Sequence, residues 1–182
     1  ETRKFYAERA IKTFGLAQVK HVAEYSASRI SEVRPIVNDL LEQGMLQEVD
    51  VTITGGDTAR FLLHREHVPL LEQALAGEIT AERTTFLSPF DSYFWAKGRD
   101  EQFWGFVQRL EAYKPASERI WGYFCLPILH RDRLVGWFNP KLERKTGTLR
   151  LKALYLEEGF EPADDLVADV AGFRRQIRVD QC

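Results

Sequence analysis

Cysteine is scarce in this sequence, with only Cys125 and Cys182 among 182 residues. Cys125 lies in an apolar stretch and Cys182 is the final residue, so we expect no structural disulfide and a reducing compartment, the cytoplasm. Long apolar runs are also missing, since none approaches the roughly 18 residues that a membrane-spanning helix needs. No signal-peptide pattern is present either, and we therefore expect no membrane partner.

Standard catalytic and cofactor motifs are absent as well. His64 and His67 are three residues apart at a strand end, not four apart on a helix as in zinc proteases, and we interpret them as a surface feature. Gly55-Gly56 indicates a hairpin turn, not a phosphate-binding loop. We therefore expect no metal, no cofactor and no catalytic residue in this chain. Asp91, in a loop, could act as a base, or could accept hydrogen bonds from backbone or arginine; we favour the second interpretation.

The first 77 residues have the pattern of three helices followed by two strands. Apolar spacing predicts helices over 3–14 and 19–25 and a third that ends near Gly44. Alternation then predicts strands over 45–54 and 59–64 around a Gly55-Gly56 turn. This order is typical of a winged-helix domain, which we place at residues 1–77.

The third helix of a winged helix usually enters the major groove of DNA, and here Arg29 and Arg34 are its outward cations. Residues 1–83, however, hold 10 Lys/Arg against 13 Asp/Glu, a net charge of −3. A helix that reads DNA alone should be basic. The alternative is a scaffold in which Arg29 and Arg34 form local ion pairs.

Residues 78–182 predict a second domain built on antiparallel strands. A hairpin is expected from 123–129 and 134–138, with further strands at 84–88 and 149–155. The spacing of apolar residues over 162–178 predicts a closing helix. The expected fold class is thus α+β: a winged-helix module followed by a small antiparallel β-barrel with a C-terminal helix.

Positive charge and aromatic residues gather in this second half. Residues 97–152 carry 12 Lys/Arg against 6 Asp/Glu, and all four Trp lie between residues 86 and 157. Interleaved cations and aromatics suit a surface that contacts phosphates and bases. The alternative is an aromatic core with a solvated charged face. The candidate DNA contacts here are Lys97, Arg99, Arg131, Arg133, Lys141, Arg144 and Lys145.

Four stretches carry a resemblance to a known family. They are residues 88–91 (SPFD), 110–119 (LEAYxPAxxR), 122–136 (GYFxLPILHxDRLVG) and 141–144 (KxxR). Together they resemble the C-terminal half of the AlkZ/YcaQ-like winged-helix DNA glycosylases. The resemblance implies tandem winged-helix modules, a C-terminal β-barrel, and excision of alkylated bases or unhooking of interstrand crosslinks in double-stranded DNA.

The sequence departs from the family pattern at two points. The family's catalytic motif, glutamine followed two residues later by glutamine or aspartate, is not matched by Gln18-Val19-Lys20 or elsewhere, so we expect a missing N-terminal part of the same protein to supply catalysis. Trp137 and Asn139 stand where members often carry Arg and Asp. We therefore expect the DNA-binding C-terminal portion of a repair glycosylase, inactive by itself. The alternative is a non-enzymatic winged-helix transcription regulator whose barrel binds a ligand or partner.

Overall fold

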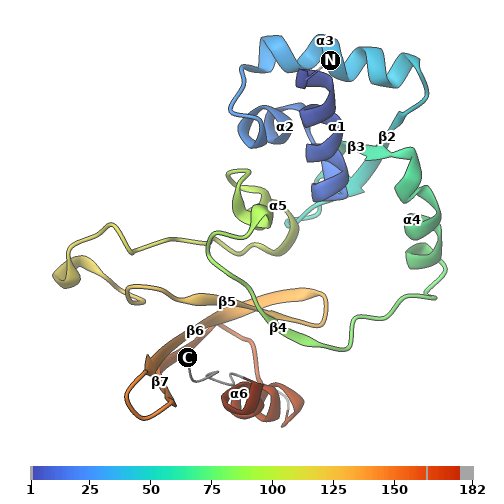
Figure 1. Ribbon diagram of the computed structural model, residues 1–182. Coiled ribbons are helices and arrows are strands. Elements are labelled where there is room, and N and C mark those ends of the chain that lie inside the picture. The colour runs from blue at the N-terminus through green and yellow to red at the C-terminus, as the bar shows by residue number, and fades with distance from the viewer. Residues whose placement is uncertain (1, 163, 177–182) are drawn as a thin grey trace. The chain divides into compact units, whose positions relative to one another are not determined.

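The computed structural model describes residues 2–162 and 164–176. The chain forms two compact units (Figure 1). The first unit comprises Glu1–Thr80 and Phe90–Val107, and the second comprises Ala81–Pro89 and Gln108–Cys182. The division expected from the sequence lay at residue 77, whereas the structure returns Phe90–Val107 to the first unit.

Three helices open the first unit: α1 (Thr2–Phe14), α2 (Val19–Tyr25) and α3 (Ile30–Glu42). Each matches a helix expected from apolar spacing. Ion pairs join α1 to α3, with Lys4 Nζ 2.6 Å from Asp39 Oδ2 and Arg3 Nη1 3.0 Å from Glu32 Oε1. These exposed pairs stabilise the unit only modestly, but they neutralise acidic groups of α3.

A three-stranded antiparallel sheet follows, in the order β1-β3-β2. Strands β2 (Leu46–Thr52) and β3 (Thr58–His64) form the expected hairpin, and β1 (Leu16–Ala17) pairs with Leu62 and Leu63 of β3. The two-residue strand β1 was not expected, because two residues carry no readable alternation. It lies in the connection between α1 and α2.

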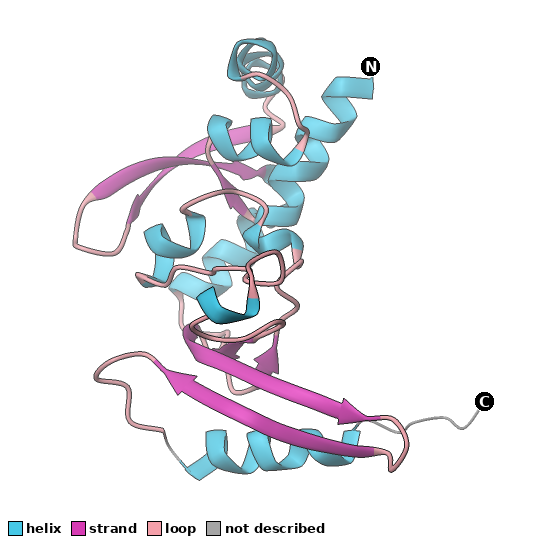
Figure 2. Ribbon diagram, turned by 90° about the vertical axis from the view of Figure 1, so that its left-hand side faces the viewer, coloured by secondary structure: helices cyan, strands magenta, loops and turns pink. Residues whose placement is uncertain are grey.

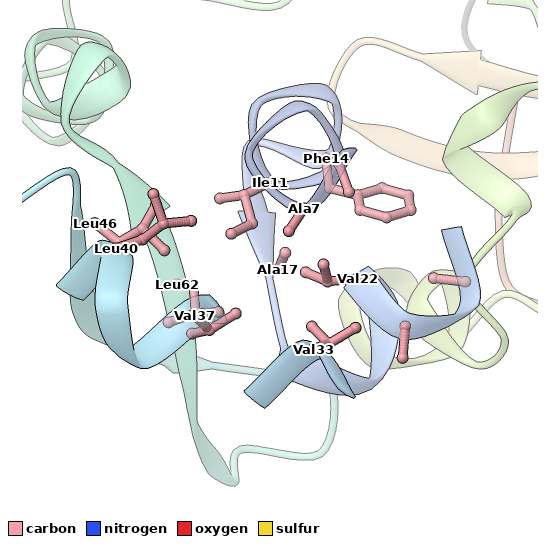
Figure 3. Packing of buried hydrophobic residues seen from close by; sticks show 13 residues of the cluster. Ala7, Ile11, Phe14, Ala17, Val22, Val33, Val37, Leu40, Leu46 and Leu62 are labelled. Atoms are coloured by element: carbon pink, nitrogen blue, oxygen red, sulfur yellow. The ribbon is translucent and has the colours of Figure 1, made fainter. Parts of the chain in front are cut away.

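The core of the first unit lies between these helices and the sheet (Figure 3). Ala7 of α1 faces Val22 of α2, Ile11 points to the side of Leu40 and Leu46, and Val37 of α3 lies by Leu62 of β3. All of these side chains are at most 5% exposed. Burial of each larger side chain in this set contributes roughly 1.5–3 kcal/mol to the stability of the fold. The entropy cost of ordering the side chain offsets part of this gain.

His64 corrects one expectation from the sequence. It was interpreted as a surface residue, yet its relative exposure is 0%. The ring accepts a hydrogen bond from the Glu66 backbone N–H at Nδ1 (3.2 Å), and Nε2 lies 3.3 Å from Glu8 Oε1. Burial lowers the pKa of His64. The His is therefore a neutral core residue that terminates β3.

The rest of the first unit consists of short elements. A 3₁₀ turn (Arg65–His67) leads into α4 (Val68–Leu75), and the returning segment contributes a 3₁₀ turn (Ser92–Phe94) and α5 (Arg99–Trp104). Asp91 Oδ1 accepts a hydrogen bond from the Tyr93 backbone N–H at 2.9 Å and so caps the second of these turns. Asp91 thus has the hydrogen-bonding role that we favoured for it.

Arg99 fastens the returning segment to α1. Its guanidinium carbon lies 4.4 Å from the ring centroid of Tyr93 and 4.9 Å from that of Phe103, and Nη2 donates to the carbonyl oxygen of Phe14 at 2.6 Å. The residue is only 3% exposed. The expectation that Arg99 contacts phosphate is corrected by this burial, since a guanidinium enclosed by rings and carbonyls is not displayed at the surface.

The second unit is built on a four-stranded antiparallel sheet in the order β4-β5-β6-β7. Its strands are β4 (Thr84–Phe86), β5 (Leu126–His130), β6 (Arg133–Glu143) and β7 (Thr148–Leu156), with a 3₁₀ turn at Ala116–Glu118. Gly136 permits the close approach of β7, because a Cβ there would lie 2.0 Å from the Tyr155 carbonyl oxygen.

This sheet is open, which corrects the expected β-barrel. Within the described residues β4 and β7 are its two edges and do not pair. Four strands are too few to close around a filled interior. Helix α6 (Asp164–Gln176) instead packs along the sheet (Figure 2), and Leu166 and Val170 join a core with Ile128, Val135 and Phe138. The expected closing helix is therefore present, over a sheet that remains open.

Candidate nucleic-acid interface

The β6–β7 hairpin carries a surplus of exposed cations. Between residues 133 and 156 the sequence has six Lys/Arg and one acidic residue, Glu143. Glu143 pairs with Arg150, with 3.1 Å between Oε1 and Nε. Within the described part of the chain, the other four hairpin cations from residue 141 onward are exposed and form no ion pair; they are Lys141, Arg144, Lys145 and Lys152. Unpaired exposed cations are the groups that attract a phosphate backbone.

The β5–β6 turn presents two further arginines in unequal situations. Arg131 has φ +55° in the turn, and its Nη2 donates to Asp165 Oδ2 at 2.8 Å. Arg133 is exposed at the start of β6 and has no ion pair among the described residues. Arg131 is therefore partly neutralised by Asp165 of α6, whereas the charge of Arg133 is available to a binding partner.

A buried carboxylate organises the loop that precedes β5. Glu111 is 2% exposed, and its Oε2 accepts hydrogen bonds from the backbone N–H of Trp121 (2.7 Å) and of Gly122 (3.3 Å). Its Oε1 lies 2.9 Å from Lys114 Nζ. Burial by itself would raise the pKa of Glu111, but these donors outweigh it and lower the pKa to about 2. Glu111 is therefore an ionised anchor for the Trp121–Gly122 backbone.

Trp121 is fixed from several directions. Its ring stacks on Trp137 with centroids 4.8 Å apart and planes 16° apart, and it meets Tyr155 edge-on at 4.9 Å. Its carbonyl oxygen accepts a hydrogen bond from Asn139 Nδ2 at 3.0 Å. Trp137 and Asn139, the two departures from the family pattern, thus both contact Trp121. Trp137 is itself held by a hydrogen bond from its Nε1 to Gln108 Oε1 at 2.9 Å.

A hollow of about 560 Å³ opens beside this aromatic cluster. It lies within the second unit, between the loop before β5 and the β6–β7 hairpin. Four rings and three cationic side chains contribute to its lining: Trp121, Tyr123, Phe124, Tyr155, Arg119, Lys141 and Lys152. No acidic residue is among the described residues that line it. Its size is that of ordinary small-ligand sites.

The candidates in the first unit form a separate and sparser set. Arg29 precedes the first residue of α3, Arg34 lies in the second turn of that helix, and both are exposed. Lys97 is exposed, and its backbone N–H donates to Glu24 Oε2 at 2.7 Å. Arg29 and Arg34 thus belong to α3 and its first flanking residue, whereas Lys97 belongs to the segment before α5.

Several residues of the second-unit surface escaped the sequence analysis as site residues. Lys152 falls within the strand expected over 149–155, where the alternation predicts a place on the solvent face. Trp121 is one of the four Trp of the second half, and Tyr155 belongs to the strand expected over 149–155. Nothing local to either signalled their contact, because Trp121 lies in the loop before β5 and meets Tyr155 of β7 beside Trp137, the β6 residue that pairs with Tyr155.

Within the described residues there is no group of three or more His, Cys, Asp or Glu placed to hold a metal ion. In the same part of the chain, no helix combines the length and apolar character that a membrane span requires.

No solved structure was found that matches the chain. The family described as DNA glycosylase AlkZ-like matches residues 1–177. This match covers nearly the whole sequence, and the chain belongs to the AlkZ-like DNA glycosylase family.

Proposed function

We propose that this chain is the DNA-binding portion of a DNA-repair glycosylase that excises alkylated bases or unhooks interstrand crosslinks. The observation that carries the proposal is the set of unpaired cations on the β6–β7 hairpin beside an aromatic cluster. Family membership supports a repair glycosylase acting on DNA. The hairpin supplies what binding of a phosphate backbone requires, a local excess of positive charge on a chain whose net charge is −2.

The first unit is proposed to be a winged-helix module with a lesser role in binding. Its order of three helices and a β-hairpin supports this assignment. The ion pairs of Glu32 and Asp39 with α1 leave Arg29, which immediately precedes α3, and Arg34 of that helix as the exposed cations there. Two cations on a unit whose net charge is negative form a weaker phosphate-binding surface than the unpaired cations of the β6–β7 hairpin.

Bond cleavage is proposed to depend on residues outside these 182. Support comes from the sequence, in which no glutamine is followed two residues later by glutamine or aspartate in a position that matches the family motif. Cleavage of an N-glycosidic bond needs a polar group that positions water and stabilises a cationic sugar. Glu111, the buried acid of the second unit, is already committed to backbone N–H groups and Lys114.

Charge reversal on each unit tests the proposal. Arg144→Glu/Lys145→Glu should weaken binding to a labelled duplex by about tenfold or more at moderate salt, because two phosphate contacts are lost and two repulsions are added. The matched variant Arg29→Glu/Arg34→Glu makes the same change of charge on the first unit and should cost less. Fluorescence anisotropy at several salt concentrations measures both. A larger loss from the α3 pair would reject the hairpin as the principal DNA contact.

A further inference from the structure

The hollow beside Trp121 differs from the exposed cations around it, because it offers ring surface and positive charge in one place. We propose that it holds a single unpaired nucleotide of DNA, with the base stacked on Tyr123 and the adjoining phosphate near Lys141 and Lys152. This inference rests on the proposed DNA-binding function and names a subsite within it. The subsite is a binding site only and breaks no bond.

Tyr123 is the ring best placed to receive a base. It is 61% exposed, whereas the neighbouring Trp137 is buried against Trp121. The guanidinium carbon of Arg119 lies 5.0 Å from the Tyr123 ring centroid, and Arg119 Nε donates to the carbonyl oxygen of Lys114 at 2.9 Å. The loop therefore holds a large exposed ring against a fixed cation, an arrangement in which a base finds both a stacking surface and a positive edge.

The wall behind Tyr123 is rigid. Trp121 is clamped by Trp137, Tyr155 and Asn139, and its backbone is anchored by Glu111. Gly122 allows this close packing, since a Cβ on it would lie 2.2 Å from Asn139 Nδ2. A preformed wall lowers the entropy cost of ordering a ligand, so a weak stacking contact can show as measurable affinity.

The charges of the hollow favour a phosphate-bearing occupant. Arg119, Lys141 and Lys152 line it, and no Asp or Glu does so among its described lining residues. An uncharged aromatic ligand would leave these cations unused. A base within a paired duplex, in turn, is already stacked on both faces and cannot reach Tyr123. An unpaired nucleotide combines a free ring with a phosphate at either side and so satisfies both parts of the site.

The test uses the 182-residue chain and three labelled DNAs of matched sequence: a fully paired duplex, the same duplex with one unpaired bulged nucleotide, and a single strand. We expect the bulged duplex to bind about fivefold or more tighter than the paired one, as one stacked base is worth at least that. Tyr123→Ala should abolish this preference and leave affinity for the paired duplex within about twofold. Tyr113→Ala is the matched control, because Tyr113 is 85% exposed in the same unit and does not line the hollow.

The outcomes distinguish failure of the nucleotide subsite from failure of the proposed DNA-binding function. Equal affinity for paired and bulged DNA, or a preference that survives Tyr123→Ala, overturns the nucleotide subsite and leaves the proposed DNA-binding function standing. A preference lost equally with Tyr113→Ala also overturns it, because ring exposure alone would then explain the effect. Binding of the single strand without binding of the paired duplex supports the subsite and contradicts the proposed function. Binding of none of the three overturns both.

Discussion

Glu111 Oε2 accepts a hydrogen bond from the backbone N–H of Trp121 at 2.7 Å, across ten positions of a loop with little regular structure. The buried carboxylate thus takes the place of a strand partner for this backbone. Trp121 in turn contacts Trp137 and Asn139 of β6 and Tyr155 of β7. One acidic side chain therefore determines where the loop meets the sheet and where the aromatic wall of the hollow stands.

Replacement of this acid should destabilise the second unit. Glu111→Gln removes the negative charge while keeping the shape, so the N–H groups of Trp121 and Gly122 lose a charged acceptor. A loss on the order of 2 kcal/mol is expected, as for hydrogen bonds to charged groups. Urea denaturation followed by tryptophan fluorescence measures it. Glu118→Gln, at an exposed position in the nearby 3₁₀ turn, is the control and should change stability little.

The same carboxylate predicts a dependence of stability on pH. The pKa of Glu111 falls from the ordinary 4.5 to about 2 on folding. A lowered folded-state pKa adds stability that is complete above the unfolded-state value and disappears as pH falls through the folded-state value. The difference in unfolding free energy between wild type and Glu111→Gln should therefore shrink as the pH falls from about 5 to about 2. Denaturation midpoints at several pH values give the difference, and a constant difference across this range would contradict the assignment.

Replacement of the buried Arg99 should cost more stability than replacement of the exposed Lys97. Arg99→Ala removes the donor to the Phe14 carbonyl and leaves a cavity between rings, so we expect a loss on the order of 3 kcal/mol of unfolding free energy. Lys97→Ala, two residues away and exposed, should stay within about 0.5 kcal/mol of wild type. Thermal unfolding followed by circular dichroism compares them. Equal stability of the two variants would show that the contacts of Arg99 do not stabilise the packing of its segment on α1.

The two arginines of the β5–β6 turn should differ in their effect on DNA binding. Arg133 is unpaired among the described residues, whereas Arg131 is engaged by Asp165. Arg133→Ala should weaken duplex binding several-fold and reduce the slope of log affinity against log salt by about 0.9, the value of one phosphate contact. Arg131→Ala should change both quantities less. Anisotropy titrations decide between them, and a greater effect of Arg131→Ala would show that DNA displaces Asp165 from its partner.

Excision by the isolated chain is not expected. Incubated with duplex DNA that carries an alkylated purine or an interstrand crosslink, these 182 residues should leave no abasic site, because the cleavage machinery is proposed to lie outside them. Strand scission after alkaline treatment is the readout, and a member of the family that contains the glutamine motif is the positive control. Turnover by the pure chain would place catalysis inside it.

The sequence by itself determined most of the secondary structure. Apolar residues at helical spacing set α1, α2, α3 and α6, and alternation around Gly55-Gly56 set the β2–β3 hairpin. These elements depend on neighbours within a few residues, where periodicity and turn chemistry act directly. Charge counts along the chain likewise indicated which half would be basic. The resemblance to the glycosylase family rested on runs of adjacent residues in the same way.

Tertiary structure alone decided what each charge and ring does. Lys97 and Arg99 look alike in sequence, yet one is exposed and the other is enclosed by Tyr93 and Phe103, because the segment that bears them returns to pack on α1. The sheet remains open for a similar reason, since its closure depends on strand number and on α6 and not on any single strand's pattern. The hollow combines residues from the loop near Trp121 with others on β6 and β7. Contacts between residues so far apart in sequence are set by packing, and no local pattern encodes them.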